Sequence, residues 1–216
     1  MESAELVSYY RRRAREYEAI YAKPERQADL ALLGKLIPDA LRGRRVLEIA
    51  CGTGYWTSRI APLAASVVAV DLAEESMRIA QSKRYPGNVR FASADAYALD
   101  ASLGRFDGAY AGFWWSHVPR SRIAAFLDSL HERLLPGAPV VFMDNRYVEG
   151  SSTPIAETDA EGNTYQRRRL VDGSENRVLK NFPDERELRE RLPGAQVRLL
   201  EYYWLARYEA PGPRVR

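Results

Sequence analysis

Two glycines separated by one residue, Gly52 and Gly54, interrupt the chain directly after an apolar segment. Residues 46–49 suit a buried strand, and residues 55–63 are compatible with a helix. A strand, a tight turn and a helix in this order open nucleotide-binding α/β units. Because glycine lacks a Cβ, both positions allow a positive φ and the close approach of a ligand. The free N–H groups at the start of the helix add an electropositive rim beside the turn.

The residues around the turn distinguish between two kinds of ligand. Glu48 places a carboxylate just before the glycines, where it would repel a pyrophosphate and favour a cationic group such as an ammonium or a sulfonium. The dinucleotide-binding fingerprint also requires a third glycine or alanine three residues after the second, and Thr57 stands there. The turn therefore favours a ligand other than a dinucleotide.

Two further acids follow the next two predicted strands. Residues 67–71 form an apolar run that ends in Asp71, which lies about twenty residues after the glycines, where an acid accepts from ribose hydroxyls. The alternative role for Asp71 is a helix N-cap, because residues 74–83 read as a helix. Asp95 follows the strand predicted over residues 89–93. Ligands of open α/β sheets bind at the carboxyl ends of the strands, so Glu48, Asp71 and Asp95 are expected to meet there.

The pattern Glu-x-Ala-Cys-Gly-Thr-Gly at residues 48–54, with the two later acids, resembles motif I and the acidic positions of the class I S-adenosylmethionine-dependent methyltransferases. The resemblance covers residues 45–145 well and the termini loosely. It implies an α/β, Rossmann-like class I methyltransferase fold: a seven-stranded, mostly parallel sheet with a reversed final hairpin, flanked by helices. A hairpin insertion is expected after strand five, since Asp172-Gly173 separates two extended runs.

The same resemblance implies one methyltransferase domain over residues 1–216. Within it we expect an N-terminal helical cap (1–40), a cofactor-binding core (41–145), a lid and hairpin insertion (146–182), and a C-terminal helix with strands (183–210). Residues 8–22 read as one helix with Tyr10, Tyr17 and Tyr21 on one face. These tyrosines are interpreted either as core packing or as a lid over a ligand.

Site residues are also implied by the resemblance, with S-adenosylmethionine as cofactor and S-adenosylhomocysteine as product. Expected cofactor-binding residues are Tyr21, Glu48, Ala50, Gly52, Thr53, Gly54, Asp71, Leu72, Asp95, Ala96, Gly112 and Phe113. Expected substrate-binding residues are Tyr17, Trp114, Trp115 and Tyr147.

His117 is the candidate catalytic residue, because it follows strand four in a loop that this family places beside cofactor and substrate. An imidazole with an ordinary pKa near 6.5 suits proton removal at neutral pH. The alternative is a structural histidine that bonds a backbone group near the helix beginning at Pro119. The sequence leaves both roles open.

Composition and net charge limit the classes of partner that the chain is expected to bind. Apolar residues make up 46% and the net charge is +3, which fits a globular protein without demanding a nucleic-acid partner. The longest apolar run is too short to span a bilayer, and the single cysteine, Cys51, excludes an intrachain disulfide. We expect a cytoplasmic protein, a monomer or homodimer, with a small-molecule acceptor, no membrane association and no metal.

Four functions are compared. The favoured one is in-line methyl transfer to oxygen or nitrogen of a small molecule. The alternatives are a methyltransferase-like module that binds the cofactor without catalysis, and an RNA or protein methyltransferase. Ala111-Gly112-Phe113-Trp114 replaces the Asn/Asp-Pro-Pro-Tyr/Phe motif of the enzymes that methylate nucleic-acid bases. An NAD-linked oxidoreductase is disfavoured by Glu48 and the missing third glycine.

Overall fold

The structure is a computed structural model and describes residues 2–212. The α-helices are α1 (Glu2–Arg13), α2 (Gln27–Ala40), α3 (Thr57–Ile60), α4 (Glu74–Gln81), α5 (Ile123–His131) and α6 (Glu185–Arg191). Short 3₁₀ helices are η1 (Ala14–Ala22), η2 (Pro24–Arg26), η3 (Ala101–Leu103), η4 (Trp115–His117) and η5 (Arg120–Arg122). The strands are β1 (Arg45–Ile49), β2 (Ser66–Asp71), β3 (Val89–Ser93), β4 (Gly108–Gly112), β5 (Pro139–Asn145), β6 (Glu157–Thr158), β7 (Thr164–Arg169), β8 (Glu175–Leu179), β9 (Gln196–Leu199) and β10 (Tyr203–Glu209).

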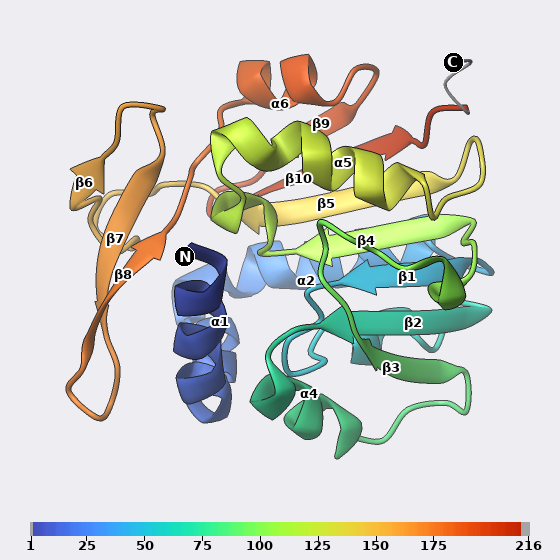
Figure 1. Ribbon diagram of the computed structural model, residues 1–216, viewed down its shortest axis with the longest axis horizontal. Coiled ribbons are helices and arrows are strands. Elements are labelled where there is room, and N and C mark those ends of the chain that lie inside the picture. The colour runs from blue at the N-terminus through green and yellow to red at the C-terminus, as the bar shows by residue number, and fades with distance from the viewer. Residues whose placement is uncertain (1, 213–216) are drawn as a thin grey trace.

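The central sheet has seven strands in the order β3-β2-β1-β4-β5-β10-β9 (Figure 1). Strands β1 to β5 pair in parallel, whereas β10 runs antiparallel to both β5 and β9. The predicted fold class, a mostly parallel seven-stranded sheet with a reversed final hairpin, is confirmed. Because the strand order reverses between β1 and β4, the carboxyl edge at this point is where ligands of such sheets bind.

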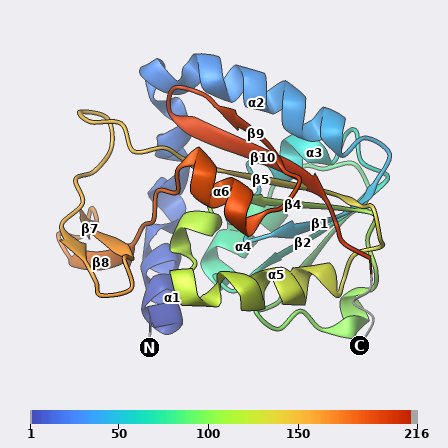
Figure 2. The same cartoon turned by 90° about the horizontal axis from the view of Figure 1, so that it is seen from above.

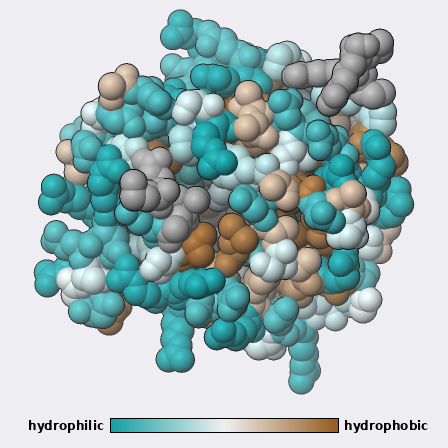
Figure 3. All heavy atoms as spheres, viewed as in Figure 1, coloured by the Kyte–Doolittle hydropathy of each residue, from teal (hydrophilic) through white to brown (hydrophobic). Residues whose placement is uncertain are grey.

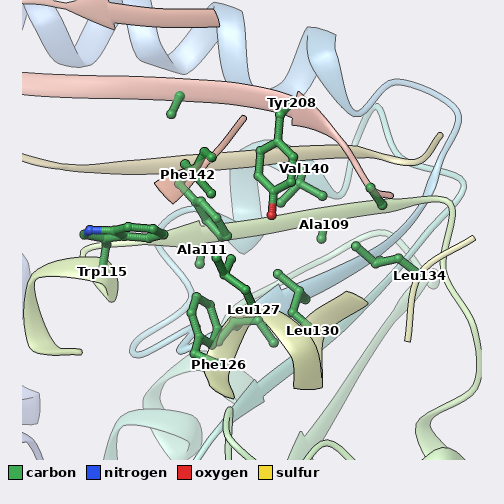
Figure 4. Packing of buried hydrophobic residues seen from close by; sticks show 14 of the residues in the cluster. Ala109, Ala111, Trp115, Phe126, Leu127, Leu130, Leu134, Val140, Phe142 and Tyr208 are labelled. Atoms are coloured by element: carbon green, nitrogen blue, oxygen red, sulfur yellow. The ribbon is translucent and has the colours of Figure 1, made fainter. Parts of the chain in front are cut away.

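Helices cover both faces of the sheet, with α2 and α3 on one side and α5 on the other (Figure 2). Strand β1 is buried from Val46 to Ile49, as expected for a parallel strand covered on each face, and Glu48 is its one buried charged residue. On the α5 side, Phe126, Leu127 and Leu130 pack against Phe142 of β5 and Tyr208 of β10 (Figure 4). These contacts fix the sheet and therefore the loops at its carboxyl edge.

The N-terminal segment differs from the sequence prediction. The α-helix begins at Glu2 and ends at Arg13, and the chain continues as the 3₁₀ helix η1. Tyr10, Tyr17 and Tyr21 therefore do not share one α-helical face. They form a series of edge-to-face contacts instead, with ring centroids 5.8 Å apart for the first pair and 6.2 Å for the second. The first crossover helix is also shorter than predicted, since α3 spans only Thr57–Ile60.

The insertion after β5 forms a separate three-stranded sheet in the order β6-β7-β8. The predicted hairpin is confirmed, with β7 and β8 paired antiparallel. Helix α1 lies between this sheet and the central one (Figure 1). Its Tyr9 packs with Leu170 and Val178 of the insertion, and Arg12 donates to Ser174 Oγ and Asn176 Oδ1. The N-terminal segment and the insertion thus form one connected cap.

Hydrophilic side chains cover most of the face drawn in Figure 3, including the area of the β6–β8 insertion. The burial pattern of β7 explains this, because Arg167 and Arg169 are exposed while Gln166 is buried. Within the described part of the chain, every helix is too short or too polar to cross a bilayer.

Candidate active site

The glycine turn is held in shape by a carboxylate of the neighbouring strand. Asp71 Oδ2 accepts from the backbone N–H of Gly52 over 2.8 Å, and Oδ1 accepts from that of Ala73 over 2.7 Å. Burial raises the pKa of Asp71, and the backbone donors counteract this rise. The acid therefore joins the turn after β1 to the loop after β2, in addition to any contact with a ligand.

The two glycines of the turn serve different purposes. Both have positive φ, 55° at Gly52 and 77° at Gly54. A Cβ on Gly54 would collide with the Tyr85 hydroxyl and lie 3.0 Å from Cβ of Ala80, whereas a Cβ on Gly52 would meet only Tyr17 Cε1, at 4.0 Å. Gly54 is thus required by packing against α4, and Gly52 leaves room beside a cavity.

That cavity, here called the turn cavity, has a volume of about 100 Å³ and lies over the carboxyl ends of β1, β2 and β4. Its walls include eight of the twelve residues predicted to bind cofactor: Ala50, Gly52, Asp71, Leu72, Asp95, Ala96, Gly112 and Phe113. Ala50 and Phe113 have φ values of 53° and 58°, the two positive values at non-glycine residues in the described chain. Backbone strain of this kind is concentrated at functional sites.

The cap closes the turn cavity. Leu6, Val7 and Tyr10 of α1 form part of its wall. Pockets that bury small ligands usually measure about 300–1,000 Å³, so the turn cavity is too small for a nucleoside cofactor in this closed arrangement. We therefore expect the cap to move when a nucleoside cofactor enters.

A second cavity of about 320 Å³, here called the basic cavity, lies between the cap, the end of β5 and the insertion. The only acid among its described lining residues is Glu16. Seven cationic side chains line it: Arg13, Lys23, Arg26, Arg167, Arg168, Arg169 and Lys180. Its electrostatic character is therefore strongly positive.

Four residues line both cavities: Tyr10, Tyr17, Phe113 and His117, here called the junction. His117 is buried, and its Nδ1 lies 2.6 Å from the carbonyl oxygen of Leu179 while its Nε2 lies 2.7 Å from the hydroxyl of Tyr10. A carbonyl only accepts, so Nδ1 carries the proton and Nε2 accepts from Tyr10. Burial, with the charges of Lys180 and Arg168, holds the pKa of His117 well below its usual value.

A buried ion pair lies behind the junction. Lys180 Nζ is 2.9 Å from Asp144 Oδ1 and 2.6 Å from Ser116 Oγ, and both charged side chains are almost fully buried. Burial lowers the pKa of Lys180 to about 8, against the attraction of Asp144. Although burial opposes it, the ammonium of Lys180 holds the pKa of Asp144 below its usual value. Both groups are charged at neutral pH.

Six predicted site residues lie outside both cavities. Glu48 is 1% exposed beneath the turn, Thr53 bonds Glu18, and Gly54 faces α4. Tyr21 stacks on Tyr55 with ring centroids 3.4 Å apart, and Trp115 packs in the core against Phe142 and Trp204. Tyr147 is exposed and contacts Phe182. Tyr17, Trp114 and His117, by contrast, line the turn cavity.

The basic cavity is not evident from the sequence. Its cations come from the end of α1, from Lys23 and η2, from β7 and from the residue after β8, which are far apart in the chain. The run Arg167–Arg169 was the available signal in the sequence, since alternation along a strand places two of the three arginines on one exposed face. In the structure Arg167 and Arg169 are exposed, whereas Arg168 is only partly exposed and lies beside Tyr9 and Tyr10.

Comparisons with known proteins agree with this arrangement. The family model described as "Methyltransferase domain" matches residues 46–137. The Mg-protoporphyrin O-methyltransferase of Rhodobacter capsulatus is 39% identical over 80 residues, 36% of this chain and 35% of that protein. The O-methyltransferase cnsE of Penicillium expansum is 32% identical over 108 residues, 48% of this chain and 38% of that protein. The matched part is thus less than half the length of these curated relatives.

Solved structures also match over nearly the whole length. One of them, described as "DhpI-SAH complex structure", is 33% identical in sequence and has a TM-score of 0.78, and the alignment covers 98% of this chain and 97% of that one. Together with the glycine turn, the acids at the strand ends and the sheet order, this match shows the family and its cofactor, S-adenosylmethionine. The chain belongs to the class I S-adenosylmethionine-dependent methyltransferases.

Proposed function

We propose that the chain transfers the methyl group of S-adenosylmethionine in line to an oxygen or nitrogen atom of a small molecule. The observation that carries this proposal is the junction, where the cavity lined by eight of the predicted cofactor residues meets a second cavity that could hold an acceptor. In-line transfer needs the two reactants in contact and aligned, and much of the rate enhancement comes from holding them so.

The residues of the turn cavity fit the cofactor chemically. Asp71 stands where an acid of this fold accepts from ribose hydroxyls, and Asp95 supplies a carboxylate toward an exocyclic amine. Leu72, Ala96 and Trp114 provide apolar walls for the adenine ring. Glu48 lies beneath the turn, and its Oε2 has no hydrogen-bond partner among the described residues. Any influence of Glu48 on cofactor binding would therefore act through the backbone of the turn.

The acceptor, we propose, binds in the basic cavity, with Tyr17 in its wall, whereas Trp114 lines the turn cavity. A volume of about 320 Å³ is at the lower end of the range for ligand pockets. This favours a small acceptor over a nucleic acid or a protein. We also propose that the chain acts in the cytoplasm as a monomer or homodimer, which light scattering after size-exclusion chromatography tests.

The experiment is an assay of S-adenosylhomocysteine formation with a library of small acceptors, preceded by calorimetry with S-adenosylmethionine and with NAD. We expect binding of S-adenosylmethionine but not NAD, and turnover with at least one acceptor. Binding without turnover across the library would support a module without catalysis. Binding of NAD alone would refute the proposal.

A further inference from the structure

We propose that the acceptor is a small molecule with an oxyanion of the phosphate or carboxylate type, and that the ionised oxygen itself receives the methyl group. This inference rests on the proposed function and names the class of acceptor for that same site. Four observations carry it: the charge of the basic cavity, a buried arginine without a counter-ion, the position of two cations beside the junction, and the absence of an available base there.

The charge of the basic cavity is not neutralised from within. Arg13, Arg26 and Arg168 line it without an ion pair to any carboxylate among residues 5–212, the side chains that the structure describes. Arg168 donates to the neutral amide oxygen Gln166 Oε1 through two nitrogens, over 3.0 and 2.7 Å. Like charges gathered around a cavity raise the local concentration of a ligand of the opposite sign.

Arg26 provides the most direct sign of an anionic ligand. Arg26 is 7% exposed. Its guanidinium donates hydrogen bonds only to neutral oxygens, Asn145 Oδ1 at 3.1 Å and Ser151 Oγ at 3.0 Å. Its Nε has no partner among the described residues. Buried charges are normally paired, so a guanidinium in a cavity wall with an unused donor indicates that an anion completes the site.

Two cations place the anion at the junction rather than elsewhere in the cavity. Arg168 lies beside the phenol of Tyr10, and Lys180 Nζ lies 6.0 Å from the ring centroid of Phe113. Arginine and lysine on adjacent sides hold an oxyanion through charge-assisted hydrogen bonds. The bound oxygen would then lie next to the turn cavity, where the methyl donor binds.

No group of the junction is available to remove a proton from the acceptor. His117 is neutral, with one ring nitrogen donating to Leu179 and the other accepting from Tyr10. Burial raises the pKa of Tyr10 and of Tyr17, so both phenols stay protonated. Lys180 is an ammonium at neutral pH. An acceptor that is already ionised needs no base.

The transfer balances without a proton. The ionised oxygen forms the new O–C bond with its own electron pair, and the pair of the broken S–C bond remains on sulfur. One negative oxygen and one sulfonium thus become an ester and a thioether. Before the transfer, Arg168 and Lys180 bind the anion. The transfer removes that negative charge, so the electrostatic attraction to both cations weakens. This helps release of the product.

The test measures binding of three probes to the purified full-length chain by calorimetry: methyl phosphate, acetate, and the neutral acetamide. Each is titrated with S-adenosylhomocysteine present, and S-adenosylhomocysteine itself is titrated alone. We expect methyl phosphate or acetate to bind and acetamide, which has the shape of acetate, to bind at least tenfold more weakly. Binding of methyl phosphate alone, or of acetate alone, identifies the type of oxyanion.

Variants assign the binding to the cations. Arg168→Met should weaken anion binding at least tenfold and leave the affinity for S-adenosylhomocysteine within twofold. Because Lys180→Met alone would leave Asp144 buried and unpaired, the double variant Lys180→Met with Asp144→Asn keeps that site neutral and should act like Arg168→Met. Arg186→Met, on the exposed face of α6, is the matched control and should change neither affinity.

The outcomes separate this inference from the proposed function. If S-adenosylhomocysteine binds but acetamide binds as tightly as the anions, or if Arg168→Met and the double variant retain anion binding, the oxyanion proposal is wrong and the proposed function stands. If S-adenosylhomocysteine does not bind to the folded chain, the proposed function itself fails.

Discussion

The hydroxyl of Tyr10 lies 2.7 Å from Nε2 of His117, which joins the cap to the loop after β4 across 107 residues of sequence. Together with the contact to the Leu179 carbonyl, this bond occupies both ring nitrogens of His117. The imidazole therefore connects three parts of the site: the cap, η4 and the end of β8.

From this geometry we predict a structural effect for His117→Ala. Its removal leaves Tyr10 and Leu179 without their partner, which should lower the free energy of unfolding by about 1–3 kcal/mol. The pKa of His117 is held far below its usual value by burial and by Lys180 and Arg168, so the wild-type protein should show no rate change near pH 6.5. Chemical denaturation and a pH–rate profile from pH 6 to 9 check both points. If the rate of the wild-type protein instead changes near pH 6.5 and this change is absent in His117→Ala, His117 acts as a base.

Asp71→Asn should weaken cofactor binding by disturbing the glycine turn. An amide oxygen can replace only one of the two carboxylate acceptors, so the N–H of either Gly52 or Ala73 loses its partner. We expect a loss of about 1–3 kcal/mol, or roughly 5- to 150-fold in Kd. Calorimetry with S-adenosylmethionine measures it. An unchanged Kd would show that Asp71 supports neither the turn nor the cofactor.

Alanine substitutions should separate the two glycines. Gly54→Ala forces a Cβ against Tyr85 and Ala80 and should destabilise the protein by more than about 2 kcal/mol. Gly52→Ala makes only an ordinary contact with Tyr17 Cε1 and should cost the strain of its positive φ, about 1 kcal/mol, while it weakens cofactor binding. Thermal melts and calorimetry on both variants provide the comparison, and equal melting temperatures would contradict it.

The central sheet could be predicted because its signals are local. Strands β1 and β2 are short apolar runs, and the glycines and Asp71 follow them at the spacing that this fold requires. The predicted cofactor residues that line the turn cavity lie at or just after the carboxyl ends of β1 to β4. Trp115 shows the limit of this reasoning, since an aromatic residue in an active-site loop can point either to the cavity or, as here, into the core.

The basic cavity could not be predicted because it depends on tertiary contacts alone. Arg26 reads as an ordinary surface arginine in sequence, yet folding places it against Asn145 and Ser151. Lys180 follows β8, and its ion pair with Asp144 depends on how the insertion returns to β5. The change from the α-helix α1 to the 3₁₀ helix η1 could not be predicted either, because residues 8–22 have the composition of one continuous helix.

Loosening the cap should speed cofactor entry. Arg12 joins α1 to the insertion through Ser174 and Asn176. Arg12→Ala removes exposed bonds worth about 0.5–1.4 kcal/mol, which should raise the association rate for S-adenosylmethionine by about two- to tenfold if opening limits it. Trp114 lines the turn cavity and offers a fluorescence signal for stopped-flow measurement. Arg15→Ala, an exposed change on η1, is the control; equal rates in both variants would argue against a closed cap.

Glu48 should make the stability of the protein depend on pH. Burial raises its pKa to about 8 in the folded state, whereas an unfolded glutamate titrates near about 4.3. Between these values the folded state binds more protons, so the free energy of unfolding falls as the pH rises from about 4.5 through 8. The full effect is up to about 5 kcal/mol. Glu48→Gln cannot titrate and should lose this part of the pH dependence.

The measurement is a series of denaturant melts from pH 5 to 9 on the wild type, Glu48→Gln and the control Glu190→Gln, whose side chain is exposed on α6. The difference in slope between the first two isolates Glu48, because all other groups titrate alike in both. We expect the wild type and Glu190→Gln to lose stability with rising pH more steeply than Glu48→Gln. Parallel curves for all three would mean that Glu48 is ionised beneath the turn, held by a cationic partner even without cofactor.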